Sequence, residues 1–154
     1  MAAIRILGIE HLNNRLERMH NIEAVKEAMN KSVLMVHGQA KELCPVDTGN
    51  LRSSIHPKVI IQGPNIIGKV YTNVNYAPFV EFGTGSVGSG TYPDPKLNLT
   101  YRNTPWTYTP DGGETFYRTS GQVARPFMYP AIKSNKTRIN NIFKEALKND
   151  IRRG

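Results

Sequence analysis

The sequence predicts an α+β fold, in which an antiparallel β-sheet packs on one face against a long helix from the N-terminal half and a second helix at the C-terminus. Apolar residues recur every three or four positions over 22–43 and again over 128–151, which is typical of helices with one buried side. Between them, apolar runs at 58–61 and 66–73 flank a Gly-Pro-Asn turn, which is typical of an antiparallel hairpin.

The first elements precede the long helix. Residues 3–9 mix apolar and polar side chains and predict an edge strand, and Leu12, Leu16 and Met19 recur at helical spacing. Asn21 is well placed to cap the long helix. The buried stripe expected on that helix consists of Ile22, Val25, Met29, Val33, Val36, Ala40 and Leu43.

A corner follows the long helix. Pro45 ends the helix, because its ring lacks an N–H and clashes with the preceding turn. Asp47 or Thr48 is expected to cap a new helical turn. Leu51 and Ile55 lie four residues apart, so they share one face and can anchor that turn in the core.

The second half of the chain changes character. Residues 75–85 gather apolar side chains on a short helical turn, in which Glu81 needs a partner if it is buried. Gly, Pro, Ser, Thr and Asn then dominate 86–123, which predicts a loop-and-hairpin insertion with strands at 106–108 and 115–118. The last helix is expected to begin around Pro126 or Pro130, and Met128, Ala131, Ile132, Ile139, Ile142, Phe143, Ala146, Leu147 and Ile151 form its apolar stripe.

Length and composition bound the class of protein. A chain of 154 residues that is 39% hydrophobic and 21% charged predicts one globular domain spanning 1–154. No apolar run approaches the roughly 20 residues of a membrane span, and the N-terminus lacks a signal-peptide layout. The lone Cys44 excludes an internal disulfide and fits a reducing compartment, so we expect an origin in the cytoplasm and no membrane partner.

The net charge of +8 is unevenly placed. Seven basic and two acidic residues follow from Lys133 onward, so the last helix carries +5 of the excess. Such a face suits nucleic acid or an acidic protein surface, although it can equally be a solvated helix face. The candidate DNA-facing residues are Lys133, Lys136, Lys144, Lys148 and Arg152.

The sequence contains no pattern that argues for an enzyme. Its four His residues lack metal-ligand spacing, and no phosphate-binding loop, dinucleotide fingerprint or nucleophile elbow is present. Cys44 is interpreted as a structural thiol. A nuclease that uses Asp47 and Glu81 is an alternative, but a cap and an ion-pair role for these carboxylates are favoured. We therefore predict no catalytic, cofactor-binding or metal-binding residue.

Aromatic residues are concentrated in the insertion. They can stack on single-stranded nucleic acid, but aromatic residues are also enriched in protein interfaces, and we favour the second reading. The candidate interface residues are Tyr92, Tyr101, Trp106, Tyr108 and Tyr117. A free basic nucleic-acid-binding module remains the alternative from another class.

Three blocks in this order resemble one family. They are 45–55 (PVDTGNLRSSI), 76–84 (YAPFVEFGT) and 124–131 (ARPFMYPA). Together with the helices before the first block and after the third, they resemble the tail-completion, or head–tail joining, proteins of tailed bacteriophages. The hallmark residues are Pro45, Asp47, Thr48, Gly49, Leu51, Arg52, Tyr76, Pro78, Glu81, Gly83, Arg125 and Pro126.

The resemblance implies a structural virion protein that assembles in the host cytoplasm as a ring, typically a hexamer. Such a ring would lie at the neck and contact the capsid connector or stopper on one side and the tail terminator or tail tube on the other. It implies no cofactor and no catalytic residue, and it allows non-specific contact with DNA in the lumen. A tail-terminator-type ring protein is a further, less favoured alternative. The long insertion at 86–123 departs from many relatives. We also expect an ion pair between Glu81 and Arg125 to join the second and third blocks.

Overall fold

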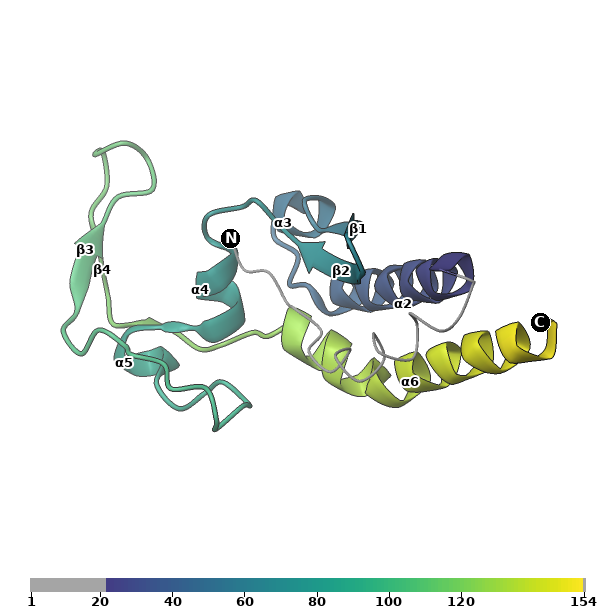
Figure 1. Cartoon of the computed structure of the whole chain (residues 1–154). Coiled ribbons are helices and arrows are strands. Elements are labelled where there is room, and N and C mark those ends of the chain that lie inside the picture. Colours follow the sequence, from purple (N-terminus) through teal and green to yellow (C-terminus); the bar gives the residue numbers. More distant parts are fainter. Residues whose placement is uncertain (1–21, 154) are drawn as a thin grey trace. The chain divides into compact units, whose positions relative to one another are not determined.

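A computed structural model describes residues 22–153, which fall into two compact units (Figure 1). The first unit contains the chain up to Asn73 together with the chain from Phe127 onward, and the second unit is Val74–Pro126. The second unit is thus inserted between two parts of the first. It begins twelve residues before the expected insertion, because the second block packs with residues 120–125. Whether the units fold as one domain stays a prediction.

The first unit is built around helix α2 (Ile22–Leu43). Its buried side carries Val25, Met29, Val33, Val36 and Ala40 as expected, together with Ala28 and Ser32. The expectation that the stripe reaches both ends is wrong, since Ile22 is 58% exposed and Leu43 is 42% exposed. Residues in terminal turns extend past the elements that cover the middle of a helix, and periodicity alone does not show where that cover ends.

A hairpin of β1 (His56–Gln62) and β2 (Asn65–Tyr71) packs on α2. The strands pair antiparallel around a Gly63–Pro64 turn, as the sequence predicts. Gly68 lets β2 approach the helix closely, because a Cβ at this position would lie 2.6 Å from Met29 Sδ and would also meet Val33. Burial alternates along β2, so that one side of the hairpin faces α2 and the other faces away.

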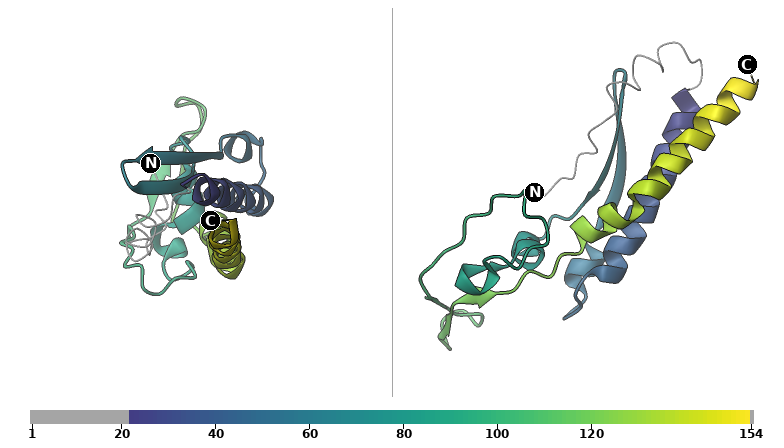
Figure 2. Two further views of the ribbon diagram at one scale, coloured as in Figure 1. Left: turned by 45° about the vertical axis from the view of Figure 1, so that its right-hand side comes forward. Right: turned by 90° about the horizontal axis from the view of Figure 1, so that it is seen from below.

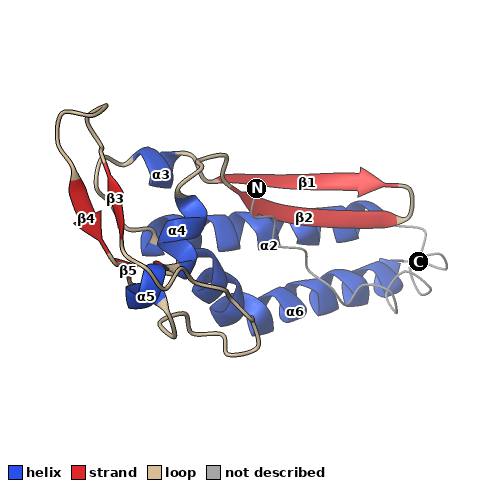
Figure 3. Cartoon of the chain, turned by 90° about the vertical axis from the view of Figure 1, so that its left-hand side faces the viewer, coloured by secondary structure: helices blue, strands red, loops and turns tan. Residues whose placement is uncertain are grey.

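Helix α6 (Met128–Arg153) completes the first unit by packing along α2 (Figure 2). Phe127, Met128, Ala131 and Ile139 are buried, and Pro130 stands in the first turn, where a missing N–H costs little. Figure 3 shows the hairpin, α2 and α6 as successive layers, with α2 in the middle. The predicted α+β class, with a long helix and a C-terminal helix beside an antiparallel hairpin, is confirmed.

One polar contact joins the two long helices. Asn135 is 2% exposed and donates from Nδ2 to the carbonyl oxygen of Ala131 at 2.8 Å and to the side-chain oxygen of Gln39 on α2. The apolar pattern of α6 did not indicate this residue. The bond to Gln39 fixes how the helices align, because sliding one past the other would break it and leave a buried N–H without an acceptor.

The second unit consists of short elements. They are α4 (Ala77–Phe82), α5 (Gly85–Gly88), β3 (Trp106–Tyr108), β4 (Tyr117–Thr119) and β5 (Gly121–Gln122). Strands β3 and β4 pair antiparallel, which confirms the predicted hairpin in the insertion. Bridges Thr84↔Gln122 and Gly85↔Gly121 bring the chain after α4 against β5.

Some expectations fall on residues that the structure does not describe. The edge strand at 3–9, the helical spacing of Leu12, Leu16 and Met19, and the Asn21 cap lie outside the described residues, as does the side chain of Arg152. Within residues 22–153, no helix is both long enough and apolar enough to span a membrane.

Candidate interaction surfaces

The corner at 44–55 is a structural joint of the first unit. Helix α3 (Asn50–Ser53) forms a single turn, and both anchors are buried, with Leu51 5% and Ile55 0% exposed. The capping prediction is confirmed in part. The Asn50 N–H donates to Thr48 Oγ1 at 3.5 Å, while the N-cap position itself is occupied by Gly49 at φ 82°, which has no side chain to cap the turn. Glycine adopts this backbone conformation with little strain, so Gly49 sets the direction of the turn and the Thr48 hydroxyl satisfies its first N–H.

Two side-chain contacts fix the corner to its surroundings. His37 Nε2 on α2 lies 3.0 Å from the carbonyl oxygen of Ile55, which accepts a hydrogen bond from it. The Ser54 hydroxyl lies 2.6 Å from the hydroxyl of Thr72, just after β2. Arg52 is exposed. The first hallmark block therefore connects the end of α2, the start of β1 and the end of β2.

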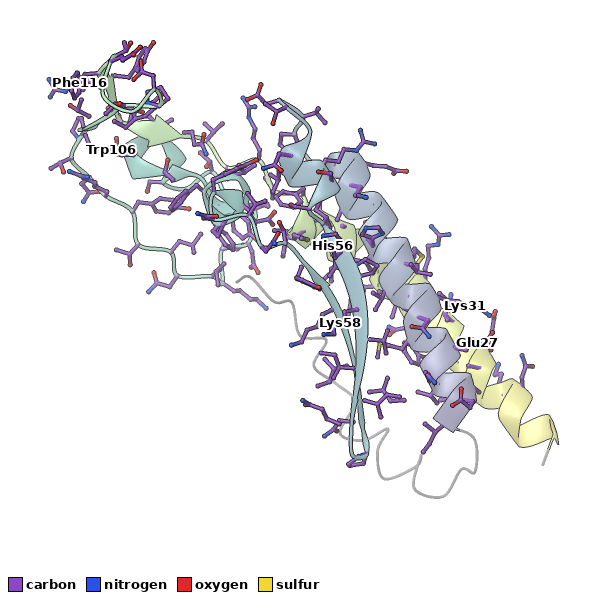
Figure 4. The ribbon with its side chains drawn as sticks, turned by 90° about the horizontal axis from the view of Figure 1, so that it is seen from above. Glu27, Lys31, His56, Lys58, Trp106 and Phe116 are labelled. Carbon is purple, nitrogen blue, oxygen red and sulfur yellow. The ribbon has the colours of Figure 1, made fainter. Side chains whose placement is uncertain are left out.

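The second and third blocks meet inside the second unit. The N–H of Arg125 donates to the carbonyl oxygen of Val80 at 2.8 Å, and Gln122 Nε2 donates to the carbonyl oxygen of Phe79 at 2.9 Å. The ion pairs found among the described residues lie on α2, between Lys26 and Glu23 and between Lys31 and Glu27 (Figure 4). The expected Glu81–Arg125 ion pair is not seen; a backbone hydrogen bond joins the two blocks instead. Glu81 is buried, at 5% exposure.

Glycines permit this close crossing. A Cβ on Gly85 would lie 2.7 Å from the carbonyl carbon of Ser120, and one on Gly83 would lie 2.7 Å from the nitrogen of Ala124. Gly88 and Gly121 are similarly confined by backbone atoms. Backbone atoms cannot move aside as flexible side chains can, so the second unit is joined by main chain against main chain.

The candidate interface aromatics divide into two groups. Tyr92 and Tyr101 act within the unit: the Tyr92 ring lies 5.0 Å from that of Phe82, and the Tyr101 hydroxyl donates to the Phe82 carbonyl oxygen at 2.8 Å. Tyr108 and Tyr117 form an exposed cross-strand pair, with ring centroids 5.8 Å apart.

Two further aromatics lie near that exposed pair. Trp106 is half-buried, with the guanidinium of Arg102 5.4 Å from its ring. Phe116, which did not figure among the candidates, is 69% exposed and is labelled with Trp106 in Figure 4. We call Tyr108, Phe116 and Tyr117 the aromatic hairpin tip. A large apolar side chain beside a glycine-rich turn is the signal that identifies Phe116.

Asp111 orders the loop of this hairpin. Its carboxylate accepts hydrogen bonds from the Thr115 N–H at 2.9 Å and the Thr109 hydroxyl at 3.2 Å. Hydrogen bonds from the Thr115 side chain and backbone, and from Thr109, lower the pKa of Asp111 to about 2. The loop that joins the two strands of the aromatic hairpin is therefore held by a carboxylate that stays ionised at any physiological pH.

The basic residues of α6 lie on its solvent side. Lys133, Lys136, Lys144 and Lys148 are exposed and fall within about a third of the helix circumference at 3.6 residues per turn. Thr137 and Asn140 share that side, which is opposite the buried Ala131 and Asn135. We call the four lysines the α6 lysine stripe, and it extends over roughly 22 Å at 1.5 Å per residue.

Asp47 and Glu81, the carboxylates of the nuclease alternative, lie in different units. Among residues 22–153, no group of three or more His, Cys, Asp and Glu side chains could hold a metal ion. Asp47 is exposed in the first unit and Glu81 is buried in the second. Cys44 is buried and its thiol lies 3.6 Å from the Pro45 carbonyl oxygen, a structural position.

Comparison with known protein families bears on residues 10–83. This span matches the HK97-gp10-like family model, described as "Bacteriophage HK97-gp10, putative tail-component". The resemblance to a phage tail family is confirmed. The match includes the whole corner and reaches Gly83, near the end of the second block, so two of the three blocks carry it. No curated protein and no solved structure matches the chain.

Proposed function

We propose that the chain is a structural, non-enzymatic component of a phage tail that assembles as a ring, a hexamer, at the neck between the capsid connector and the tail tube. The family match over residues 10–83 supports the placement in the tail. The observation that carries the assembly role is the composition of the second unit. Among its residues Val74–Pro126, Ala77 is the one apolar side chain that is buried.

A unit of this size without an apolar core has little to stabilise it alone. It exposes Phe79, Val87 and Val123 in addition to the aromatic hairpin tip. The exposed fractions of these six side chains range from 44% for Val87 to 69% for Phe116. Large exposed apolar side chains on an ordered loop are typical of contacts between proteins. Contacts between unlike faces of successive subunits close into a ring when the rotation allows, and the aromatic hairpin tip provides one such face.

The α6 lysine stripe suits the DNA that passes through such a ring. Its lysines share their side of α6 with Thr137 and Asn140, and the Lys133 ammonium lies 5.2 Å from the centre of the Tyr129 ring, so the surface offers positive charge and hydrogen bonds. Phosphate groups need only these, and binding of this kind is independent of base sequence and weakens steeply with salt. DNA contact is the secondary part of the proposal.

Labelling of virions tests the location. Gold-conjugated antibodies against the chain should decorate the neck of intact particles and the upper end of isolated tails. Label elsewhere along the tail would replace the neck with another tail layer, and absence from the particle would refute the virion role. Light scattering of the purified chain tests the ring: a hexamer that falls to monomer in Phe116→Ala, with an unchanged circular dichroism spectrum, supports the hairpin contact.

The nucleic-acid-binding alternative makes a different prediction. A free binding module would be monomeric and would bind single-stranded DNA through stacking, so that Phe116→Ala and Tyr117→Ala would weaken binding. The ring proposal expects those variants to alter assembly, while weak duplex binding depends on Lys144 and Lys148.

A further inference from the structure

The side of the β1–β2 hairpin that faces away from α2 carries an ordered set of cross-strand pairs. Ile66, Gly68 and Val70 are buried toward α2, so the alternate residues of β2 face outward. The strand register sets each of them opposite an outward residue of β1. We call this surface the outward face, and its pairs are His56↔Tyr71, Lys58↔Lys69, Ile60↔Ile67 and Gln62↔Asn65.

Two like charges stand directly opposite each other on this face. Lys58 pairs with Lys69 in the register, which places their Cβ atoms about 5 Å apart, and such like-charged pairs destabilise a sheet. The chain contains no Asp or Glu between Asp47 and Glu81. The ion pairs among the described residues both lie on α2, so no described carboxylate neutralises either ammonium group.

Apolar rows lie on both sides of the lysine pair. The next pair toward the turn is Ile60 and Ile67, and both side chains are half-buried. The next pair away from the turn is His56 and Tyr71, whose ring centroids lie 6.0 Å apart. Figure 4 labels His56 and Lys58 along this strand. Successive rows are two residues apart, or roughly 6.6 Å, which is the spacing of same-side residues in an extended chain. An extended segment that reads apolar, acidic, apolar on one side matches all three rows.

The chemistry of the rows selects the occupant. A phosphate backbone could use the lysines but would leave the isoleucine and aromatic rows without apolar contact. Another copy of this chain carries a net charge of +8 and is repelled by the lysine pair. We propose that the outward face binds an extended acidic segment of another protein, whose carboxylate lies between Lys58 and Lys69. This site is distinct from the aromatic hairpin tip and does not depend on the ring.

A peptide-binding measurement with the full chain tests the site. The probe is a fluorescent synthetic peptide with the order valine, threonine, glutamate, threonine, valine, so that valine, glutamate and valine share one side of the extended chain. The control peptide has lysine in place of glutamate. Lys58→Glu creates an attractive cross-strand pair with Lys69, so this variant should melt no lower than the parent. It should bind the acidic peptide at least about tenfold more weakly, as the loss of a charge-assisted contact implies.

Lys144→Glu is the matched control, because it changes the net charge equally but lies on α6. The proposal expects this variant to keep its affinity for the peptide. Equal losses in both variants would reduce the effect to net charge, and the proposal would fail. It would fail also if the parent bound both peptides alike, or neither. Finally, duplex DNA that displaces the acidic peptide from the parent would show that a phosphate backbone occupies the outward face.

Discussion

The two units of this protein are stabilised in different ways. In the first unit, α2, the hairpin and α6 bury Met29, Val33, Ile55 and Phe127, each with no more than 3% of its surface exposed. In the second unit, the buried positions among Val74–Pro126 are Ala77, Glu81 and three glycines. Apolar burial supplies most folding free energy, so the first unit is built to be stable and the second is built to hold a defined backbone geometry.

This difference indicates where order in the second unit comes from. Its segments cross at glycines and exchange backbone hydrogen bonds, while the side chains of the aromatic hairpin tip stay at the surface. Hydrogen bonds contribute little net stability but make one geometry far better than its neighbours. In the proposed ring, such a unit would gain further stability when its exposed apolar side chains are covered by a neighbouring subunit.

Removal of the largest buried ring should produce the greatest effect. Phe127→Ala should lower the free energy of unfolding of the first unit by about 3–5 kcal/mol, through lost apolar burial and the cavity left behind. Phe116→Ala removes the same phenyl ring from a side chain that is 69% exposed, and it should change the free energy of unfolding by less than about 0.5 kcal/mol. Chemical denaturation measures both. Equal effects would show that the second unit has a core of its own.

Blocking the glycine crossing should affect the second unit selectively. Gly85→Ala combines a φ of 64° with a Cβ 2.7 Å from a backbone atom, and should cost roughly 2–4 kcal/mol of local stability. Limited proteolysis should then cut within Val74–Pro126 while the first unit resists. Gly90→Ala is the control, because its φ of 74° carries the same strain with nothing within 4 Å. Identical cleavage of the two variants would mean that φ alone matters.

The polar contact between the long helices should matter less. Asn135→Ala removes the donor to Gln39 and the donor to the Ala131 carbonyl oxygen, and should lower the free energy of unfolding by about 1–2 kcal/mol. The exposed Asn140→Ala on the same helix should leave thermal denaturation nearly unchanged. A silent Asn135→Ala would show that packing alone aligns α2 and α6.

The smallest effect concerns the loop of the aromatic hairpin. The pKa of Asp111 is lowered from 3.8 to about 2, so its stabilising contacts are fully present above pH 4 and are lost as the pH falls through 2. An NMR titration of the Asp111 carboxyl carbon should give a midpoint near pH 2. Thr115→Val removes the largest contribution and should raise the midpoint toward 3.8. A midpoint already near 3.8 in the parent would mean that the loop is not held this way.

The sequence predicted those parts of the fold that depend on local periodicity. The spacing of Val25, Met29 and Val33 located α2, and the Gly63–Pro64 turn located the hairpin. The apolar pattern predicted burial wrongly at Ile22 and Leu43, because burial at the ends of a helix depends on how far the neighbouring elements extend. It also missed Asn135, because this buried residue is polar. Periodicity measures the polarity of side chains and says nothing of which partner each one finds.

The interaction surfaces were less predictable. The exposed pair Tyr108 and Tyr117 could be anticipated from the aromatic strands around a glycine turn, whereas Tyr92 and Tyr101 turned inward through contacts with Phe82 that no local pattern records. Lys58 and Lys69 lie opposite each other because of the strand register. The position of the turn determines that register, and neither residue reveals it when considered alone.

The contact of Gln39 with Asn135 has a consequence for the time course of folding. It joins residues 96 positions apart, so the helix pair of the first unit closes a loop that contains the whole second unit. Long-range closure of this kind is slow compared with formation of a hairpin. During synthesis α2 and the β1–β2 hairpin leave the ribosome long before α6 does. A nascent chain therefore has to keep the side of α2 that carries Gln39 without its partner helix until α6 has been made.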